Sequence, residues 1–127
     1  MVSYKWFYEP IYKMNYYFVV CQNQKDFLNT IGKHYGITDI PFVDGAYGKS
    51  VAITSNGKVI LCTWVKSKNS IAEFVHELIH TLIGLFETIE HPLKANNDEP
   101  IAYLAEYLTN QFLSKKDWKV FTNVSKH

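Results

Sequence analysis

The stretch that decides the fold is residues 70–86, SIAEFVHELIHTLIGLF. Its apolar residues recur every three or four positions, which predicts a helix that is buried over most of its surface. Ser70 stands three residues before Glu73, which is the spacing of a capping box, so we expect the helix to begin at Ser70. The rest of the chain must then supply a surface on which this helix can pack.

Two extended runs lie upstream of this helix, at residues 50–54 and 58–65. Asn56 and Gly57 stand between them, and Asn-Gly between strand-forming residues is the strongest short-range signal for a β-hairpin, because both central residues of a type I′ turn need a positive φ. We therefore expect a β-hairpin to lead into the helix.

Further elements are expected on both sides. Residues 16–21 predict a strand, and residues 25–35 predict a helix that is closed by Gly36. A second helix should begin at residues 97–100, Asn-Asp-Glu-Pro, where acidic residues and a proline suit a first turn. Together the elements predict an α+β fold, in which a small mixed or antiparallel sheet packs on the active-site helix and a second helix crosses below it. At 127 residues the chain has room for one core, so we expect a single domain over residues 1–127.

Composition excludes several classes of protein. Thirteen basic residues against twelve acidic ones give a net charge of +1, which does not favour a nucleic-acid partner. All thirteen are lysine, and the missing arginine disfavours phosphoryl transfer. The apolar run at residues 16–21 is too short for a signal peptide or a membrane span. We therefore predict a cytoplasmic protein with no membrane partner, its oligomeric state left open. In such a chain Cys21 and Cys62 are expected to be buried thiols and not a disulfide.

The pattern His76-Glu77-x-x-His80 on the central helix can hold a metal ion. Residues four apart lie on one helix face with Cβ atoms about 6 Å apart, so both imidazoles can reach one ion. Glu77 points roughly 100° around the helix, where a glutamate can act as general base on a water that the metal activates. Two histidines leave the site incomplete, because catalytic zinc takes three protein ligands and keeps a fourth position for water.

Several downstream residues are candidates for the third ligand. Glu87 shares the face of the pair, yet it lies roughly 10 Å along the axis from His80, too far for a bond of about 2 Å. His91 follows the helix and would have to fold back. Glu99 opens the second helix, and an antiparallel arrangement would bring it opposite the pair. Glu106 lies on the same face as Glu99 and is the reserve candidate, or an acceptor for an imidazole N–H.

The combination of His76-Glu77-x-x-His80 with residues 98–104, Asp-Glu-Pro-Ile-Ala-Tyr-Leu, resembles the small zinc peptidases of gluzincin type that phages and prophages encode. The resemblance covers roughly residues 47–113. ImmA/IrrE-type peptidases are a second, looser match, sharing the hairpin, the H-E-x-x-H helix and an E-x-x-A that begins the next helix. Thermolysin-like gluzincins carry an acid four residues after the ligand glutamate, and that position is Tyr103 here, so the resemblance does not name the group that orients the imidazoles.

This resemblance implies one zinc ion per chain, held by His76, His80 and Glu99, with Glu77 as general base. We therefore expect a zinc-dependent metallopeptidase that is encoded by a phage or mobile element and hydrolyses a peptide or protein substrate. One alternative is a non-catalytic, metal-stapled module that binds a host protein, for which Glu77→Gln would leave function intact. Another is a regulatory peptidase that cuts one specific partner and is inert on casein.

Two tyrosines of the second helix could assist the chemistry. Tyr103 and Tyr107 follow Glu99 at helical spacing, and either hydroxyl could stabilise an oxyanion. The alternative is that both belong to the core and have satisfied hydroxyls, which is the commoner use of a tyrosine at such spacing.

The strand at residues 58–65 is expected to lie nearest the metal. If it is an edge strand, an extended peptide could add to it by β-augmentation, with its scissile carbonyl over the zinc. Val59, Leu61 and Thr63 would then form a substrate-binding edge.

Overall fold

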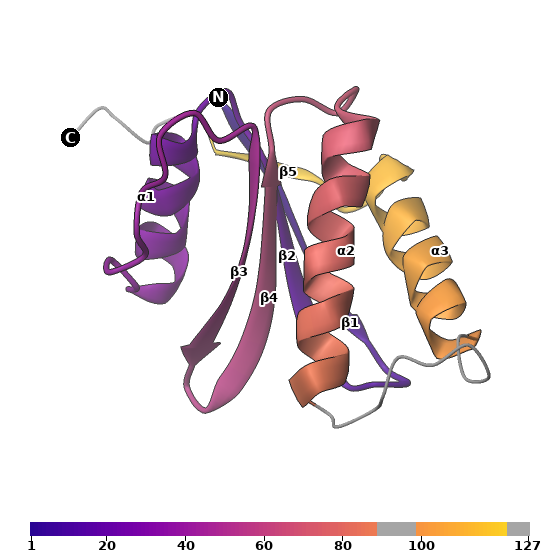
Figure 1. The fold of residues 1–127 in the computed structure, drawn as a ribbon. Coiled ribbons are helices and arrows are strands. Elements are labelled where there is room, and N and C mark those ends of the chain that lie inside the picture. Colours follow the sequence, from indigo (N-terminus) through magenta and orange to yellow (C-terminus); the bar gives the residue numbers. More distant parts are fainter. Residues whose placement is uncertain (89–98, 122–127) are drawn as a thin grey trace.

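A computed structural model describes residues 1–88 and 99–121, without the side chains of residues 87 and 88 (Figure 1). Five strands and three helices follow in the order β1 (Val2–Glu9), β2 (Met14–Val20), α1 (Gln24–Tyr35), β3 (Gly48–Ser55), β4 (Lys58–Val65), α2 (Ile71–Thr88), α3 (Glu99–Leu113) and β5 (Lys119–Phe121). The expected α+β class with a mixed sheet is confirmed.

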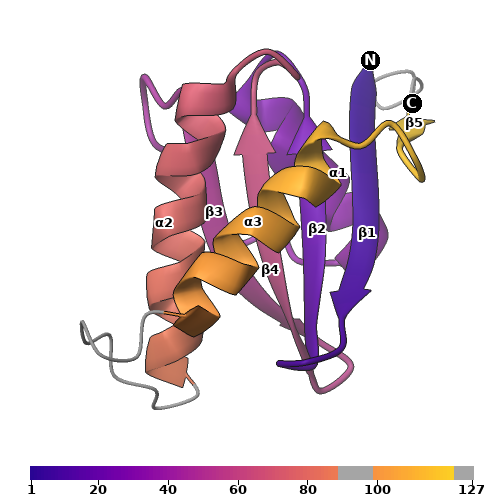
Figure 2. The same cartoon turned by 90° about the vertical axis from the view of Figure 1, so that its right-hand side faces the viewer.

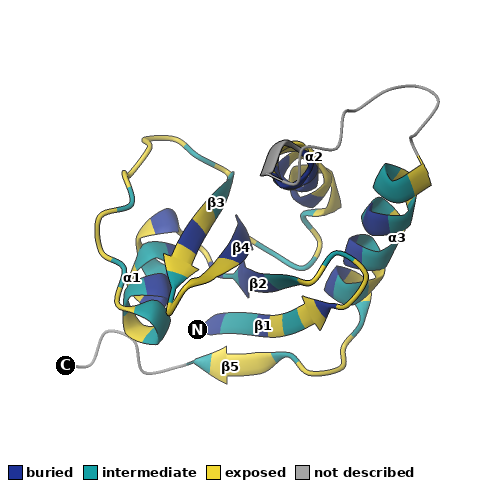
Figure 3. Cartoon of the chain, turned by 90° about the horizontal axis from the view of Figure 1, so that it is seen from below, coloured by how far each residue is buried: buried dark blue, intermediate teal, exposed yellow. Residues whose placement is uncertain are grey.

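The five strands form one sheet in the order β3-β4-β2-β1-β5 (Figure 2). β2 and β4 pair in parallel at its centre, and every other neighbouring pair is antiparallel. α1 covers one face, while α2 and α3 lie side by side on the other (Figure 3). The helix that carries the H-E-x-x-H pattern thus packs over the β3–β4 side of the sheet, and it contacts both strands.

The predicted turns form as expected. Asn56 and Gly57 have φ values of 52° and 76°, as a type I′ turn requires, so the β3–β4 hairpin is confirmed. α1 begins after Asn23, whose side chain accepts a hydrogen bond from the Asp26 amide at 2.9 Å. It ends at Gly36, which has a φ of 72° and donates its N–H to the Gly32 carbonyl at 2.9 Å.

The position of β4 differs from the sequence prediction. β4 pairs with β3 on one side and with β2 on the other, so Val59, Leu61 and Thr63 do not lie on an edge strand, and the edge beside α2 is β3. The physical reason is burial on both faces: all six residues from Ile60 to Val65 are buried, as is typical of an interior strand.

The capping box at the start of α2 is a second correction. The Ser70 amide donates to the Ser67 carbonyl at 3.0 Å, so it is already paired and does not need the carboxylate of Glu73. α2 covers Ile71–Thr88, and the Phe74 amide makes its first helical bond to the Ser70 carbonyl at 2.9 Å, so the expected start of the helix at Ser70 is confirmed. Glu73 is thereby left to the surface of the helix.

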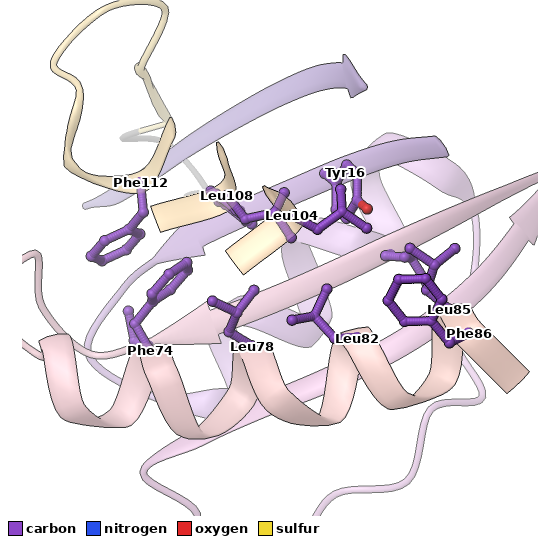
Figure 4. Close-up of a cluster of buried hydrophobic side chains, with 12 residues drawn as sticks. Tyr16, Phe74, Leu78, Leu82, Leu85, Phe86, Leu104, Leu108 and Phe112 are labelled. Carbon is purple, nitrogen blue, oxygen red and sulfur yellow. The ribbon is translucent and has the colours of Figure 1, made fainter. Parts of the chain in front are cut away.

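Two hydrophobic clusters hold the layers together, one on each face of the sheet. In the cluster under α2 and α3, Phe74 stacks on Phe112 with ring centroids 4.0 Å apart, and Leu78 and Leu82 meet Leu104 and its neighbours (Figure 4). Because this face of α2 packs on the core, the opposite face of the helix is exposed to solvent.

Cys21 and Cys62 are buried free thiols in the cluster under α1, as expected. None of the helices in residues 1–88 and 99–121 combines the length and the apolar character that a membrane crossing needs.

Candidate metal centre

His76 and His80 lie on the solvent-facing side of α2, and their Nε2 atoms are 3.3 Å apart. Two nitrogens bound at about 2.05 Å to one tetrahedral ion are about 3.3 Å apart, so the pair has the spacing of a zinc chelate. Without a metal, an N–H···N hydrogen bond can span the same separation. His76 is 68% exposed in its side chain, so an ion held by the pair would be open to solvent.

Glu77 lies next to this pair but faces β3 instead of solvent. Only 8% of Glu77 is exposed, and its Oε2 atom lies 4.0 Å from Nε2 of His76. Its carboxylate receives no hydrogen bond from any residue that the structure describes. Buried polar groups are normally hydrogen-bonded, so a nearly buried carboxylate without a donor marks a candidate binding or catalytic site.

Gly48 makes the position of Glu77 available. A Cβ at Gly48 would stand 3.1 Å from Cγ and 3.2 Å from Oε2 of Glu77, closer than nine in ten real Cβ contacts. The backbone of Glu77 is fixed as well, because its carbonyl accepts from Ser50 Oγ at 2.8 Å and from Thr81 Oγ1 at 3.0 Å. α2 is thus anchored to the edge strand at the residue expected to act as base.

A cleft runs between β3 and α2 and passes the histidine pair. One cavity of about 490 Å³ is lined by Gly48 of β3 and by Glu73, His76 and Glu77 of α2. A second cavity of about 310 Å³ lies further along the same two elements, with His80 and the mainly apolar residues Val51, Ala52, Val59, Leu61 and Gly84 among its lining. Val59 and Leu61 therefore reach the cleft as lining residues, although their strand is not its edge.

Among the described residues, no third metal ligand lies next to His76 and His80. α3 runs antiparallel to α2 and begins beside the C-terminal part of that helix (Figures 1 and 2). Glu99, the first residue of α3, and Glu106 are both exposed. No three His, Cys, Asp or Glu side chains come together as a metal group within residues 1–88 and 99–121. Glu99 stays a prediction, whereas His91 and the side chain of Glu87 lie outside the described residues.

The two tyrosines of α3 face the β1–β2 hairpin. Tyr103 donates its hydroxyl to Oε2 of Glu9 at 3.1 Å and stacks on Tyr107 with centroids 5.9 Å apart. Partial burial and the Glu9 carboxylate raise the pKa of Tyr103. No described contact joins either tyrosine to the histidine pair, so the oxyanion role stays a prediction while the hydroxyl of Tyr103 has a structural partner.

Three charged residues that lie outside the candidate site but connect the strands, turns and helices around it could not be identified from the sequence. Glu9 is fully buried and accepts the amides of Ile11 and Tyr12 at 2.8 and 2.7 Å. Lys5 and Lys68 donate to the carbonyls of residues 111 and 112 at the end of α3, at 2.9 and 2.6 Å. The sequence gives no local signal for the contacts that Lys5 and Lys68 make with α3. Gly48, which lies against Glu77, is marked in the sequence only as a glycine before a strand run.

No protein-family model, curated protein or solved structure significantly matches this chain. Its function therefore has to be argued from the site itself.

Proposed function

We propose that this chain is a zinc-dependent metallopeptidase with a minimal zincin-like domain, of the kind encoded by phages and mobile elements and acting in the host cytoplasm. The observation that carries the proposal is the carboxylate of Glu77. It is nearly buried, has no hydrogen-bond donor in the described part of the chain, and lies 4.0 Å from an imidazole of the histidine pair. A structural metal staple would not need an acid without a hydrogen-bond donor at this place. The two buried free thiols are consistent with a reducing compartment.

Two of the three protein ligands that catalytic zinc takes are in place, and both are of a kind that zinc prefers. His76 and His80 would hold the ion through their Nε2 atoms, which already have the tetrahedral spacing. Glu99 is the proposed third ligand, and its approach to the pair would need a shift of the first turn of α3. A bound zinc ion would supply Lewis acidity, which lowers the pKa of water and polarises a peptide carbonyl.

The chain's own groups would carry the proton and the substrate. Oε2 of Glu77 would accept the proton that the attacking water gives up and deliver it to the nitrogen of the leaving amine. β3 would hold the peptide, because it is the sheet edge beside α2 and its outer backbone groups can pair with an added strand. The β-augmentation expected of residues 58–65 is thus reassigned to Gly48–Ser55.

The first test is the zinc content of the untagged chain, purified without chelator and measured by mass spectrometry. We expect about one zinc per chain in the wild type and in Glu77→Gln, and a large loss of zinc in His76→Ala. Glu99→Ala should weaken zinc binding, and Glu106→Ala should not. Cleavage of a proteome-derived peptide library should then require zinc and be lost in Glu77→Gln.

Different failures have different meanings. A wild-type chain that binds no zinc even when zinc is added would overturn the proposal. Zinc binding without any cleavage, and with Glu77→Gln fully functional in the cell, would identify a metal-stapled binding module. Cleavage of one partner alone, with casein untouched, would identify a regulatory peptidase.

A further inference from the structure

The cavity of about 490 Å³ at the N-terminal end of the cleft has an acidic lining. Glu73 and Glu77 both line it, and no lysine does. Nζ of Lys66 lies 4.7 Å over the ring of Tyr47, a residue that lines both this cavity and a separate cavity to which Lys66 also contributes. A group that enters the first cavity therefore meets two carboxylates and no lysine, beside His76, a proposed zinc ligand.

Glu73 is free to bind such a group. The Ser70 amide, its expected partner, donates to the Ser67 carbonyl instead. Within the described residues the Glu73 carboxylate makes no hydrogen bond or ion pair. It is also one helical turn from Glu77, the acid of the site, so both point into the same cavity.

The direction of a bound peptide follows from the order of residues along the cleft. The first cavity, of about 490 Å³, is lined by Gly48 of β3 and Glu73 of α2. The second, of about 310 Å³, is lined by Ala52 of β3 and Gly84 of α2, so both elements run from the first cavity to the second. A peptide would add to the β3 edge in antiparallel fashion, since antiparallel pairing is the more stable arrangement. Its chain would then run from the second cavity to the first, so the residue after the scissile bond enters the cavity that contains Glu73.

We infer that this site prefers peptides with a lysine or arginine directly after the scissile bond, selected by Glu73, and a small or medium apolar side chain directly before it. The preference before the bond comes from the second cavity, of about 310 Å³, where Ala52 and Leu61 contribute apolar lining. This inference rests on the proposed function, because it takes the cleft beside His76 and His80 as the place where a peptide is cut.

The test separates binding from cleavage. Two hexapeptides that differ only in lysine or norleucine at the fourth position are titrated by calorimetry into zinc-loaded Glu77→Gln, which should hold them uncut. We expect the lysine peptide to bind about three- to tenfold more tightly, the range of a partly enclosed ion pair. Adding Glu73→Gln should abolish the difference, and adding Glu73→Lys should reverse it towards a peptide with glutamate. Asp39→Asn, which removes an exposed carboxylate outside the cleft, is the matched control and should change nothing.

The outcomes are distinguishable. Equal affinity for the two peptides, or a lysine preference that persists in Glu73→Gln, would overturn the inference even if the wild type cuts peptides. A preference that depends on Glu73, with no cleavage of either peptide by the zinc-loaded wild type, would support the recognition site and overturn the peptidase. Cleavage before lysine in the library, lost in Glu73→Gln, would support both.

Discussion

Replacing Gly48 with alanine should displace the carboxylate of Glu77 and leave zinc binding intact. The new Cβ would stand 3.1 Å from Cγ of Glu77 and 3.1 Å from the carbonyl oxygen of Trp64, against 3.4–4 Å for ordinary contact. The Trp64 carbonyl belongs to the backbone of an interior strand and cannot rotate away, so the side chain of Glu77 has to move. Overpacking of this kind costs about 1–3 kcal/mol.

Thermal unfolding and turnover measure the two consequences separately. At about 2.1 cal/mol/K per residue, unfolding of this chain has an entropy of about 270 cal/mol/K, so each kcal/mol lowers Tm by about 4 °C. Gly48→Ala should therefore lower Tm by about 4–11 °C. If Glu77 is the base, a displacement of a few tenths of an ångström should also lower kcat, by less than the roughly hundredfold loss that a misplacement of about 1 Å brings. Zinc content should not change, because the histidine pair is formed within α2 alone.

Gly32→Ala is the matched control. Its Cβ would meet the Ile37 carbonyl and a methyl of Thr38 at ordinary distances of 3.6 and 3.7 Å, far from the cleft. It should stabilise α1 by about 0.5–1 kcal/mol, because glycine is a poor helix former. Full stability and full turnover in Gly48→Ala would refute the argument, since Glu77 would then not be held against β3.

Two further predictions concern stability. Burial raises the pKa of the Cys21 and Cys62 thiols to about 12 from an ordinary value near 9. Between these pKa values the unfolded chain loses protons that the folded chain keeps, so the free energy of unfolding falls as pH rises above 9. In urea titrations from pH 9 to 10, the free energy of unfolding of the wild type should fall by up to about 1.4 kcal/mol per pH unit more than that of Cys62→Ala. Equal slopes would mean that the thiol is not buried. Phe112→Ala should cost about 3–5 kcal/mol, because the ring is buried and stacked on Phe74; a loss below 1 kcal/mol in the same assay would show that α3 does not pack on α2.

Local elements could be predicted because their signals lie within a few residues. Asn56-Gly57 fixed the hairpin, and Gly36 ended α1 where a positive φ was needed. β1 could not be predicted in this way, since Lys5 and Glu9 interrupt its apolar pattern although both are buried. Their partners, the Gln111 carbonyl and the Tyr103 hydroxyl, lie about a hundred residues away in sequence.

In the candidate site, too, the features set by local spacing could be predicted, and those set by tertiary packing could not. The spacing of His76 and His80 is a property of one helical turn, and the structure gives it the separation that zinc requires. The burial of Glu77 depends on Gly48, whose contribution appears only once β3 lies beside α2. Whether residues 58–65 form an edge strand stays open in the sequence, because a run of apolar residues does not say which strands it will pair with. The third ligand depends on how α3 meets α2, and helical periodicity does not fix that.

The parallel pairing of β2 with β4 gives the molecule an order of assembly. It joins residues 45 positions apart, such as Asn15 and Ile60, while each flanking hairpin closes within its own segment. Closing so long a loop is slow compared with forming a hairpin or a helical turn. The histidine pair needs only one turn of α2, whereas the burial of Glu77 needs the sheet. If the chain is a peptidase, holding zinc and cutting a peptide would therefore depend on different parts of the fold.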